Sequence, residues 1–294
     1  MPYAGELSAL VTAACWSLSS IAFASATVRA GALPVNVTRL VLATLYLAIT
    51  VAAAGLSLRL SASQLGLLSL SGIIGLAFGD SFLFLAYREV GARVTMLMMA
   101  LAPGVAALLA WPLLGDRLSV PAVAGIMITL AGVATVVMER EKGPAARVNL
   151  RGLWYGALAA VGQGVGLIVA KMAFLQGEIN GFAATFVRLL ASLLIMLPLG
   201  IAGQKSTGAF RSMNADPRAF GLTALGAVFG PFLGIAFSLI AVARTEVGVA
   251  ATIMAMQPIL MLPLVRIIYR ERLSRRSIAG ACVAVAGVAI LFLR

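Results

Sequence analysis

The chain has 294 residues, of which 62% are hydrophobic and 11% are charged, and its formal net charge is +12. Soluble domains carry roughly 25% charged residues because polar side chains must cover their exterior, so this composition excludes a soluble globular protein and places most of the chain in lipid. The basic residues lie in short loops between apolar runs, which also excludes nucleic-acid binding as the reason for the high charge.

Ten apolar runs follow one another along the chain. A membrane-spanning helix needs about 20 apolar residues, and clusters of charged residues, Gly and Pro separate runs of about that length. We expect the first run to remain in the protein because it lacks the pattern of a cleavable signal peptide. The sequence therefore predicts an all-α membrane protein with ten transmembrane helices, or nine if the short last run does not span. The runs are 6–28, 35–55, 65–87, 94–114, 120–138, 152–174, 181–203, 219–243, 247–267 and 277–293.

The chain contains an internal repeat. The segment GDRLSVPAVAGIMITLAGVA at 115–134 returns at 270–289 as RERLSRRSIAGACVAVAGVA, with nine identical positions at an offset of 155 residues. The repeat divides the chain into five-helix halves, 1–143 and 144–294. Because five is odd, the second half must enter the membrane upside down, as in many secondary transporters. We therefore expect an inverted-topology repeat around a central cavity; the alternative is a duplicated helix arrangement with no transport role.

The distribution of Lys and Arg predicts the orientation. The loops after the odd-numbered runs, counted together with Arg266 at the end of the ninth run, carry 15 of these residues, whereas the even-numbered loops and the two tails carry 4. Basic residues mark the cytoplasmic side of short loops. Both termini are therefore expected outside the cell.

Small residues recur at every fourth position in the third and eighth runs, at equivalent places in the two halves. The segments are SGIIGLAFG at 71–79 and GAVFGPFLG at 226–234. Such stripes let helix backbones approach closely in lipid. We assign their glycines to tight helix packing or to sliding of helices during gating: Gly75, Gly79, Gly230 and Gly234.

Two prolines lie at equivalent places within the fourth and ninth runs. Pro103 and Pro258 each remove a backbone donor and predict a kinked helix. Met99 and Met256 come shortly before them, and methionine suits both irregular packing and tolerant binding surfaces. The two methionines are therefore candidates for a cavity wall or for simple packing.

Apart from Glu6 and Arg266 at the ends of their runs, four charged residues lie within apolar runs, where charge is costly and suggests function. Asp80 is either a cavity carboxylate that meets a substrate amine or a proton, and so matters more for transport than for folding, or one half of a structural ion pair with Arg39. Arg39 is otherwise expected to anchor its helix at the membrane interface, and Lys171 to snorkel toward its end of the sixth run. Arg188 lies deeper, and with Lys171 forms a pair of additional candidate binding residues.

Two amides and one indole complete the candidates. Gln163 and Gln257 lie in mid-run, and a buried amide needs partners, so each bridges helices or contacts a polar ligand. Trp16 also lies in mid-run, and alignment of the two halves places it near the position of Gln163. An inward-facing Trp16 would stack on a ligand, whereas a lipid-facing one would only pack.

These features resemble the drug/metabolite transporter superfamily, EamA type. The resemblance covers essentially the whole chain, and it rests on ten helices in two halves, a mid-helix Pro, the turn G-D/E-R-L-S and the following AG…AGVA. It implies a central cavity that opens alternately to each side and is lined by the helices that carry Trp16, Asp80, Met99, Gln163 and Gln257. Many relatives keep their termini in the cytoplasm, so the outside termini expected from the charge count are a departure.

The resemblance and the residues together predict an exporter of small organic metabolites in the bacterial inner membrane. An amino acid is the expected substrate, because a Trp- and Met-lined cavity with one acid suits a zwitterion, and the aromatic amino-acid exporter (YddG-like) branch is the preferred one. The alternatives are a multidrug exporter and a nucleotide-sugar or phosphate-ester carrier, which needs clustered cations. An enzyme is not expected, because the chain has no His and one deep acid. We expect no metal, no cofactor and no nucleic acid; the partners are the substrate and the lipid bilayer, and the protein acts as a monomer.

Overall fold

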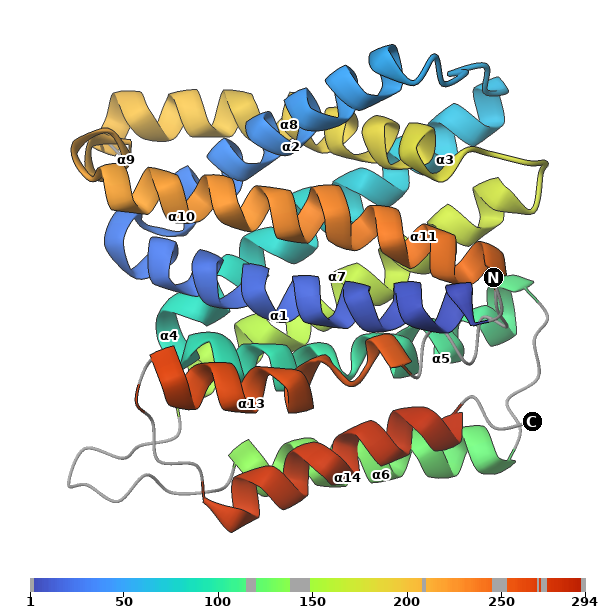
Figure 1. Cartoon of the computed structure of the whole chain (residues 1–294), viewed down its shortest axis with the longest axis vertical. Helices are drawn as coiled ribbons and strands as arrows, with labels where there is room; N and C mark the ends of the chain where they lie inside the picture. The colour runs from blue at the N-terminus through green and yellow to red at the C-terminus, as the bar shows by residue number, and fades with distance from the viewer. Residues whose placement is uncertain are drawn as a thin grey trace.

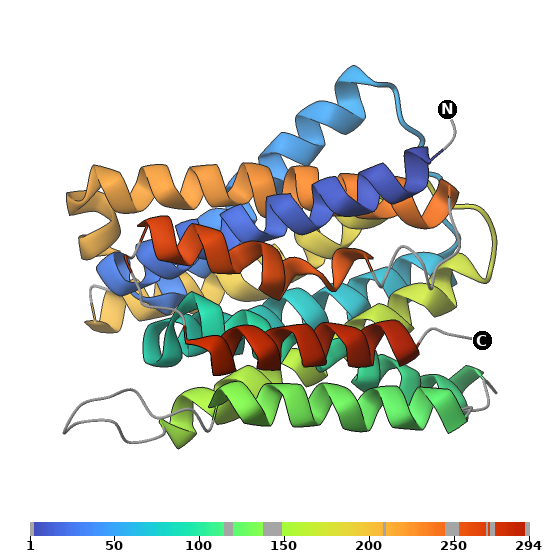
Figure 2. The same cartoon turned by 60° about the horizontal axis from the view of Figure 1, so that its bottom comes forward.

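The computed structural model describes residues 3–114, 120–137, 149–207, 210–244, 253–268, 270 and 274–291, and these residues contain helices and turns but no strand. The long helices run side by side in one bundle (Figure 1, Figure 2). Helix α1 begins and helix α14 ends at the same end of the bundle (Figure 1). This arrangement agrees with an even number of membrane crossings.

The predicted runs fall on helices wherever the structure describes them, and six helical stretches are long and apolar enough to cross a membrane by themselves. The predicted turns GDRLS at 115–119 and RERLS at 270–274 lie mostly outside the described residues. The helices of the first half are α1 (Ala4–Ala30), α2 (Ala32–Ala53), α3 (Ala62–Gly72), the π-helix η1 (Ile73–Gly79), α4 (Asp80–Met99), α5 (Ala102–Leu114) and α6 (Val120–Val137). Those of the second half are α7 (Leu150–Phe174), α8 (Gly181–Thr207), α9 (Arg211–Ala215), α10 (Pro217–Ala227), the π-helix η2 (Val228–Gly234), α11 (Ile235–Arg244), α13 (Gln257–Ile268) and α14 (Arg275–Leu291).

Glycines with positive φ make two of the sharp turns between spans. Gly31 has a φ of 90° and ends α1, so that α2 begins one residue later. Gly91 has a φ of 72° and interrupts α4 within the predicted loop REVGAR, at the boundary between the third and fourth runs. Side chains other than Gly rarely adopt such angles. These two glycines therefore let consecutive spans reverse direction with almost no loop.

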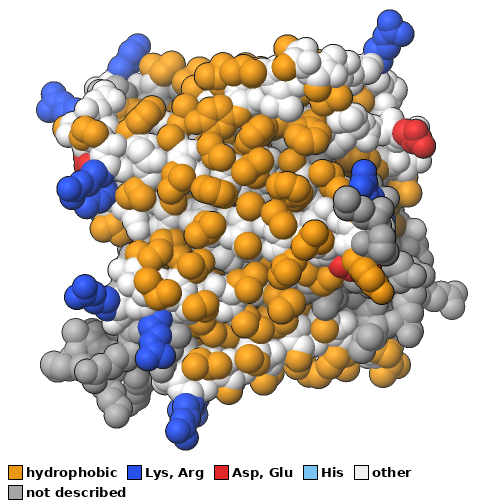
Figure 3. All heavy atoms as spheres, in the orientation of Figure 1, with side chains coloured by type: hydrophobic (Ala, Val, Ile, Leu, Met, Phe, Trp, Pro, Cys, Tyr) orange, Lys and Arg blue, Asp and Glu red, His pale blue; other side chains and the backbone are white. Residues whose placement is uncertain are grey.

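The bundle turns apolar side chains outward as well as inward. Leu45, Ile49 and Leu194 are among many large hydrophobic residues that are exposed. Figure 3 shows such side chains across the breadth of one face, with Lys and Arg at its margins. At one margin Arg29 pairs with Asp216 at 2.8 Å, and the hydrogen bond from Arg29 holds the pKa of that carboxyl below its usual value. The surface therefore has the apolar band that a lipid environment requires.

The last helices of the two halves, α6 and α14, pack along each other at one side of the bundle (Figure 2). Glycines form their seam: a Cβ on Gly132 would collide with the backbone of Ala284, and one on Gly287 with that of Thr129. Small residues at such a seam let the backbones touch, which favours helix association in lipid. The repeated segment from which the duplication was inferred therefore pairs with its own copy.

Candidate functional site

The two halves share an unusual feature at equivalent positions. The π-helices η1 and η2 each span seven residues, and their bounds differ by the same 155 residues as the sequence repeat. π-Helices are rare and occur frequently at functional sites. The predicted glycine stripes form these segments, and Asp80 follows directly after η1.

Each π-helix packs against the first helix of the opposite half. In η1, Gly79 lies so close to Gly162 of α7 that a Cβ on Gly162 would be 2.7 Å from the Gly79 Cα. In η2, a Cβ on Gly234 would be 2.5 Å from the indole of Trp16 in α1. Trp16 thus faces inward onto η2 and not toward the lipid. Gly79 is the equivalent of Gly234 in the repeat, and it lies beside Gln163 as Gly234 lies beside Trp16. Trp16 and Gln163 therefore occupy equivalent places in the two halves.

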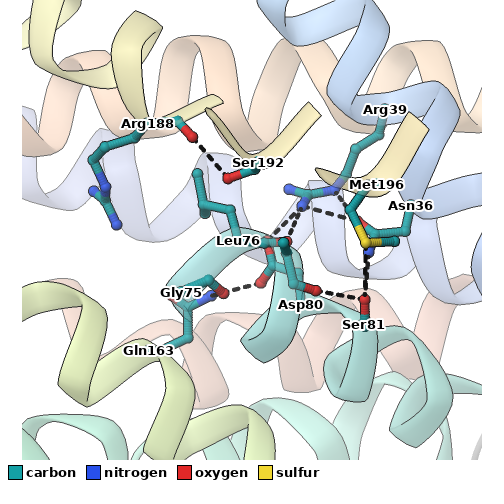
Figure 4. Close-up of polar contacts among 11 residues, drawn as sticks. Asn36, Arg39, Gly75, Leu76, Asp80, Ser81, Gln163, Arg188, Ser192 and Met196 are labelled. Carbon is teal, nitrogen blue, oxygen red and sulfur yellow. Dashed lines mark hydrogen bonds and ion pairs between the residues drawn. The ribbon is translucent and has the colours of Figure 1, made fainter. Parts of the chain in front are cut away.

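Asp80 lies at the centre of a buried polar cluster formed by Asn36, Arg39, Asp80 and Gln163, which we call the Asp80 cluster (Figure 4). The guanidinium of Arg39 donates to one carboxylate oxygen of Asp80 at 2.5 Å, and the amide of Gln163 donates to the other oxygen at 2.5 Å. Gln163 also donates to the Gly75 carbonyl at 3.1 Å. Both oxygens of Asp80 are therefore engaged, which is the arrangement expected of a structural ion pair.

Arg39 is not an interface anchor, and that prediction is wrong. The residue is 4% exposed, and its guanidinium also donates to the side-chain oxygen of Asn36 at 3.0 and 3.1 Å. It lies 5.3 Å from the ring centre of Phe84, a distance at which a cation is attracted by an aromatic face. Asn36 in turn donates to Ser81 at 3.1 Å. Arg39 turns inward because Asp80 and Asn36 offer partners that lipid cannot.

A second cluster, formed by Ser17, Ser20, Met96 and Gln257, lies farther along the same bundle; we call it the Gln257 cluster. The Gln257 amide donates to the Ser20 hydroxyl at 3.1 Å and to the Met96 sulfur at 2.9 Å. The Ser17 hydroxyl donates to the Gln257 carbonyl at 3.2 Å. Gln257 therefore bridges helices α13, α1 and α4, as one of its two predicted roles required.

One face of α4 connects the two clusters. Asp80, Phe84 and Tyr87 follow at helical spacing and are all buried. The Tyr87 hydroxyl donates to Met96 of the Gln257 cluster at 3.7 Å, and the rings of Phe84 and Tyr87 lie 5.7 Å apart. Reasoning from sequence missed Tyr87 and Met96, as well as Asn36. Asn36 was detectable, because it lies one helical turn before Arg39 and so on the same face.

The two prolines mark breaks in their spans rather than kinks. Ala100 and Leu101 form a turn between α4 and α5, and Pro103 is the second residue of α5. Met256 lies in a turn before α13, in which Pro258 is the second residue. Proline is tolerated in the first turn of a helix, where its missing N–H has no intrahelical partner. Met99 ends α4 and packs against the core that contains Phe84.

The remaining candidates lie apart from both clusters or at their edge. Lys171 is exposed in the last turn of α7, in keeping with a snorkelling side chain. A groove of about 450 Å³ opens between α2, α8 and α10, lined mainly by apolar side chains together with Thr38 and Lys205, and none of the predicted site residues lines it. Arg188 of α8 lies beside the Asp80 cluster, and its side chain points toward Gly75 (Figure 4).

Comparison with known proteins identifies relatives across the whole chain. An uncharacterized transporter of Archaeoglobus fulgidus is 23% identical over 292 residues, which cover 98% of this chain and 97% of that protein. A probable 4-amino-4-deoxy-L-arabinose-phosphoundecaprenol flippase subunit ArnE of Pseudomonas paraeruginosa is 35% identical over 113 residues, 35% of this chain and 93% of that protein. A solved crystal structure shares the fold, with a TM-score of 0.69 and 21% identity over 98% of this chain and 94% of that one.

The family profile matches the chain twice. The first match covers residues 3–138 and the second covers residues 150–293, so that nearly all of the sequence is included. This match over nearly all of the sequence places the chain in the EamA-like transporter family.

Proposed function

We propose that the protein is a secondary transporter that exports small organic metabolites by alternating access of its two inverted halves, acting as a monomer in the bacterial inner membrane. The observation that carries the proposal is the pair of π-helices, each of which packs on the opposite half. Helix η1 packs on α7, and η2 packs on α1. Equivalent elements that each contact the opposite half are what a transporter with two equivalent gates, one for each side of the membrane, requires.

Polar contacts between the halves support the same mechanism. The hydrogen bond from Gln163 to Asp80 joins the second half to the first, and so do those from Gln257 to Ser20 and Met96. Rocking of the halves against each other would break and re-form these hydrogen bonds. Their breakage would accompany the change between two states of the transporter, each closed at a different end.

Amino acids with apolar side chains, aromatic ones included, are the first substrate class to test. The half-buried Trp16, Met99 and Met256 supply apolar contact surface, and the Asp80 and Gln257 clusters supply polar groups. A second candidate class is phosphate-linked sugars. Two observations favour it. The ArnE relative is named a probable flippase subunit for a phosphoundecaprenol-linked amino sugar, and two guanidinium groups, Arg39 and Arg188, lie beside one carboxylate.

Transport in proteoliposomes tests the proposal. Purified protein is reconstituted, and uptake of radiolabelled phenylalanine, leucine and glucose 6-phosphate and of a cationic dye is compared with that of protein-free liposomes. We expect saturable flux of an amino acid. Flux of the dye alone would move the assignment to drug export, and flux of the sugar phosphate alone would favour the second class. Absence of flux for every solute would reject the proposed function.

A further inference from the structure

Arg188 is a cation inside the bundle whose side chain forms no close ion pair among the described residues. It lies seven residues after the start of α8, roughly two helical turns into the span. Its buried Nε–H donates to no acceptor among the described residues, although the Arg188 backbone carbonyl accepts a hydrogen bond from the Ser192 hydroxyl at 2.7 Å. A charge at membrane depth that is held without a counter-ion marks a pathway or binding residue.

Asp80 does not fill this role. Its two oxygens are already occupied by Arg39 and Gln163, and the close ion pair belongs to Arg39. Counting Arg39 and Arg188 as +1 each and Asp80 as −1 gives this group of side chains a net charge of +1, with Arg188 half-buried. Because an unbalanced charge at membrane depth is costly, an anion supplied from outside the chain would stabilise the group.

The absence of a side chain at Gly75 leaves a small space beside Arg188. A Cβ built on Gly75 would lie 3.5 Å from the guanidinium Nη2 of Arg188, 3.9 Å from the Gln163 side-chain oxygen and 3.7 Å from the Gly166 Cα. These are ordinary contact distances, so room for at least a methyl group exists next to the guanidinium. Figure 4 shows the Arg188 side chain on the Gly75 side of the cluster, where its guanidinium forms no hydrogen bond or ion pair with the other residues drawn.

We propose that Arg188 binds the anionic group of the transported solute, a carboxylate or a phosphate, over Gly75 at the contact of α8, η1 and α7. This inference rests on the proposed transport function and adds the substrate class. A guanidinium presents parallel N–H donors that match both oxyanions. Because the site lies where η1 of the first half meets α7 of the second, a bound anion would contact both halves at once.

Ligand-dependent thermal stability of the purified protein tests the site without a transport assay. Inorganic phosphate and acetate are titrated separately at constant chloride, with tetramethylammonium as the cationic control. We expect one or both anions to raise the melting temperature of the wild type in a saturable manner. Stabilisation by acetate indicates a site for a carboxylate, and stabilisation by phosphate indicates a site for a phosphate group. Arg188→Gln should weaken this binding about tenfold to a hundredfold, as expected for the loss of hydrogen bonds from a charged group. Arg188→Lys should retain part of it.

Gly75→Ala provides a second variant that leaves the charge in place. Its new methyl group makes only ordinary contacts, so the protein should fold, yet it occupies the space assigned to the anion. We expect weakened anion binding in Gly75→Ala and unchanged binding in the control Gly221→Ala, whose Cβ meets nothing within 4 Å. Because Arg188→Gln removes an unbalanced buried charge, it should melt at or above the wild-type temperature without ligand.

The outcomes separate this inference from the proposed function. Saturable anion binding that depends on Arg188, without flux of any solute, would support the site and reject transport. Flux of a solute with unchanged affinity in both Arg188→Gln and Gly75→Ala would support transport and overturn the site. A lower melting temperature of Arg188→Gln with unaltered anion binding would also overturn it, because Arg188 would then be a structural partner of Asp80.

Discussion

The ion pair between Arg39 and Asp80 is the residue-level feature on which the interior depends. Both side chains are about 5% exposed, and each has further hydrogen bonds, from Arg39 to Asn36 and from Gln163 to Asp80. Such a pair seldom adds net stability compared with apolar residues of the same size, but loss of one partner leaves the other buried and unpaired. The pair therefore matters most through what its disruption leaves behind.

We expect Asp80→Asn to destabilise the protein by about 3–5 kcal/mol, because it leaves the Arg39 guanidinium without its counter-ion. The double variant Asp80→Asn with Arg39→Gln should recover most of the loss. Melting temperature and expression level in detergent extracts measure both effects.

Flux through the recovered double variant then separates the two interpretations of Asp80. Wild-type flux would mean that the pair is structural, whereas a stable protein without flux would mean that the carboxylate acts in transport. An Asp80→Asn single variant as stable as the wild type would contradict the buried-pair argument.

At the level of elements, the α6–α14 seam shows how the small residues of the repeat are used. Gly132 faces Gly280 and Ala284, and no side chain fits between the two backbones. By contrast, Gly104 of α5 faces the side chain of Ile126 at 3.5 Å, which leaves room for a methyl group. Glycines of similar appearance in the sequence therefore differ in the cost of substitution.

Gly132→Val should force α6 and α14 apart and destabilise the protein by about 1–3 kcal/mol, the range typical of overpacking. Gly104→Ala serves as the matched control and should be near neutral. Thermal unfolding monitored in detergent measures the difference. Equal melting temperatures for the two variants would show that α6 and α14 can move apart without loss of stability.

At the level of the whole molecule, the connections at one end of the bundle differ in charge from those at the other. At one end, four basic residues lie in helices beside the connections, whereas the connection between α2 and α3 at the other end carries Arg59 alone. The four are Arg29, Lys205, Arg211 and Arg218. Basic loops remain in the cytoplasm during insertion. The charge distribution therefore predicts that α1 begins outside the cell, although membership of the family does not require this orientation.

Labelling of introduced cysteines tests the orientation. In a Cys282→Ser background, Ser57→Cys and Ser212→Cys place exposed thiols at opposite ends of the bundle. An impermeant maleimide added to spheroplasts should label Ser57→Cys and should reach Ser212→Cys only after the membrane is permeabilised. The reverse pattern would show that the charge count misleads and that the termini face the cytoplasm.

The sequence by itself determined the membrane class, the helical spans and the duplication, because each follows from a pattern within the chain. About 20 consecutive apolar residues span a bilayer, and a repeat is visible by comparing two segments. The sequence also pointed to Asp80, Gln163 and Gln257 as polar residues in apolar surroundings. Only the tertiary structure decided their partners. Arg39 and Gln163 lie 41 and 83 residues from Asp80 and meet it through the rotation and register of packed helices, which no local pattern specifies. The π-helices and the broken spans likewise depend on neighbouring backbones that lie far away in the chain, and so does the position of the Arg188 guanidinium beside Gly75.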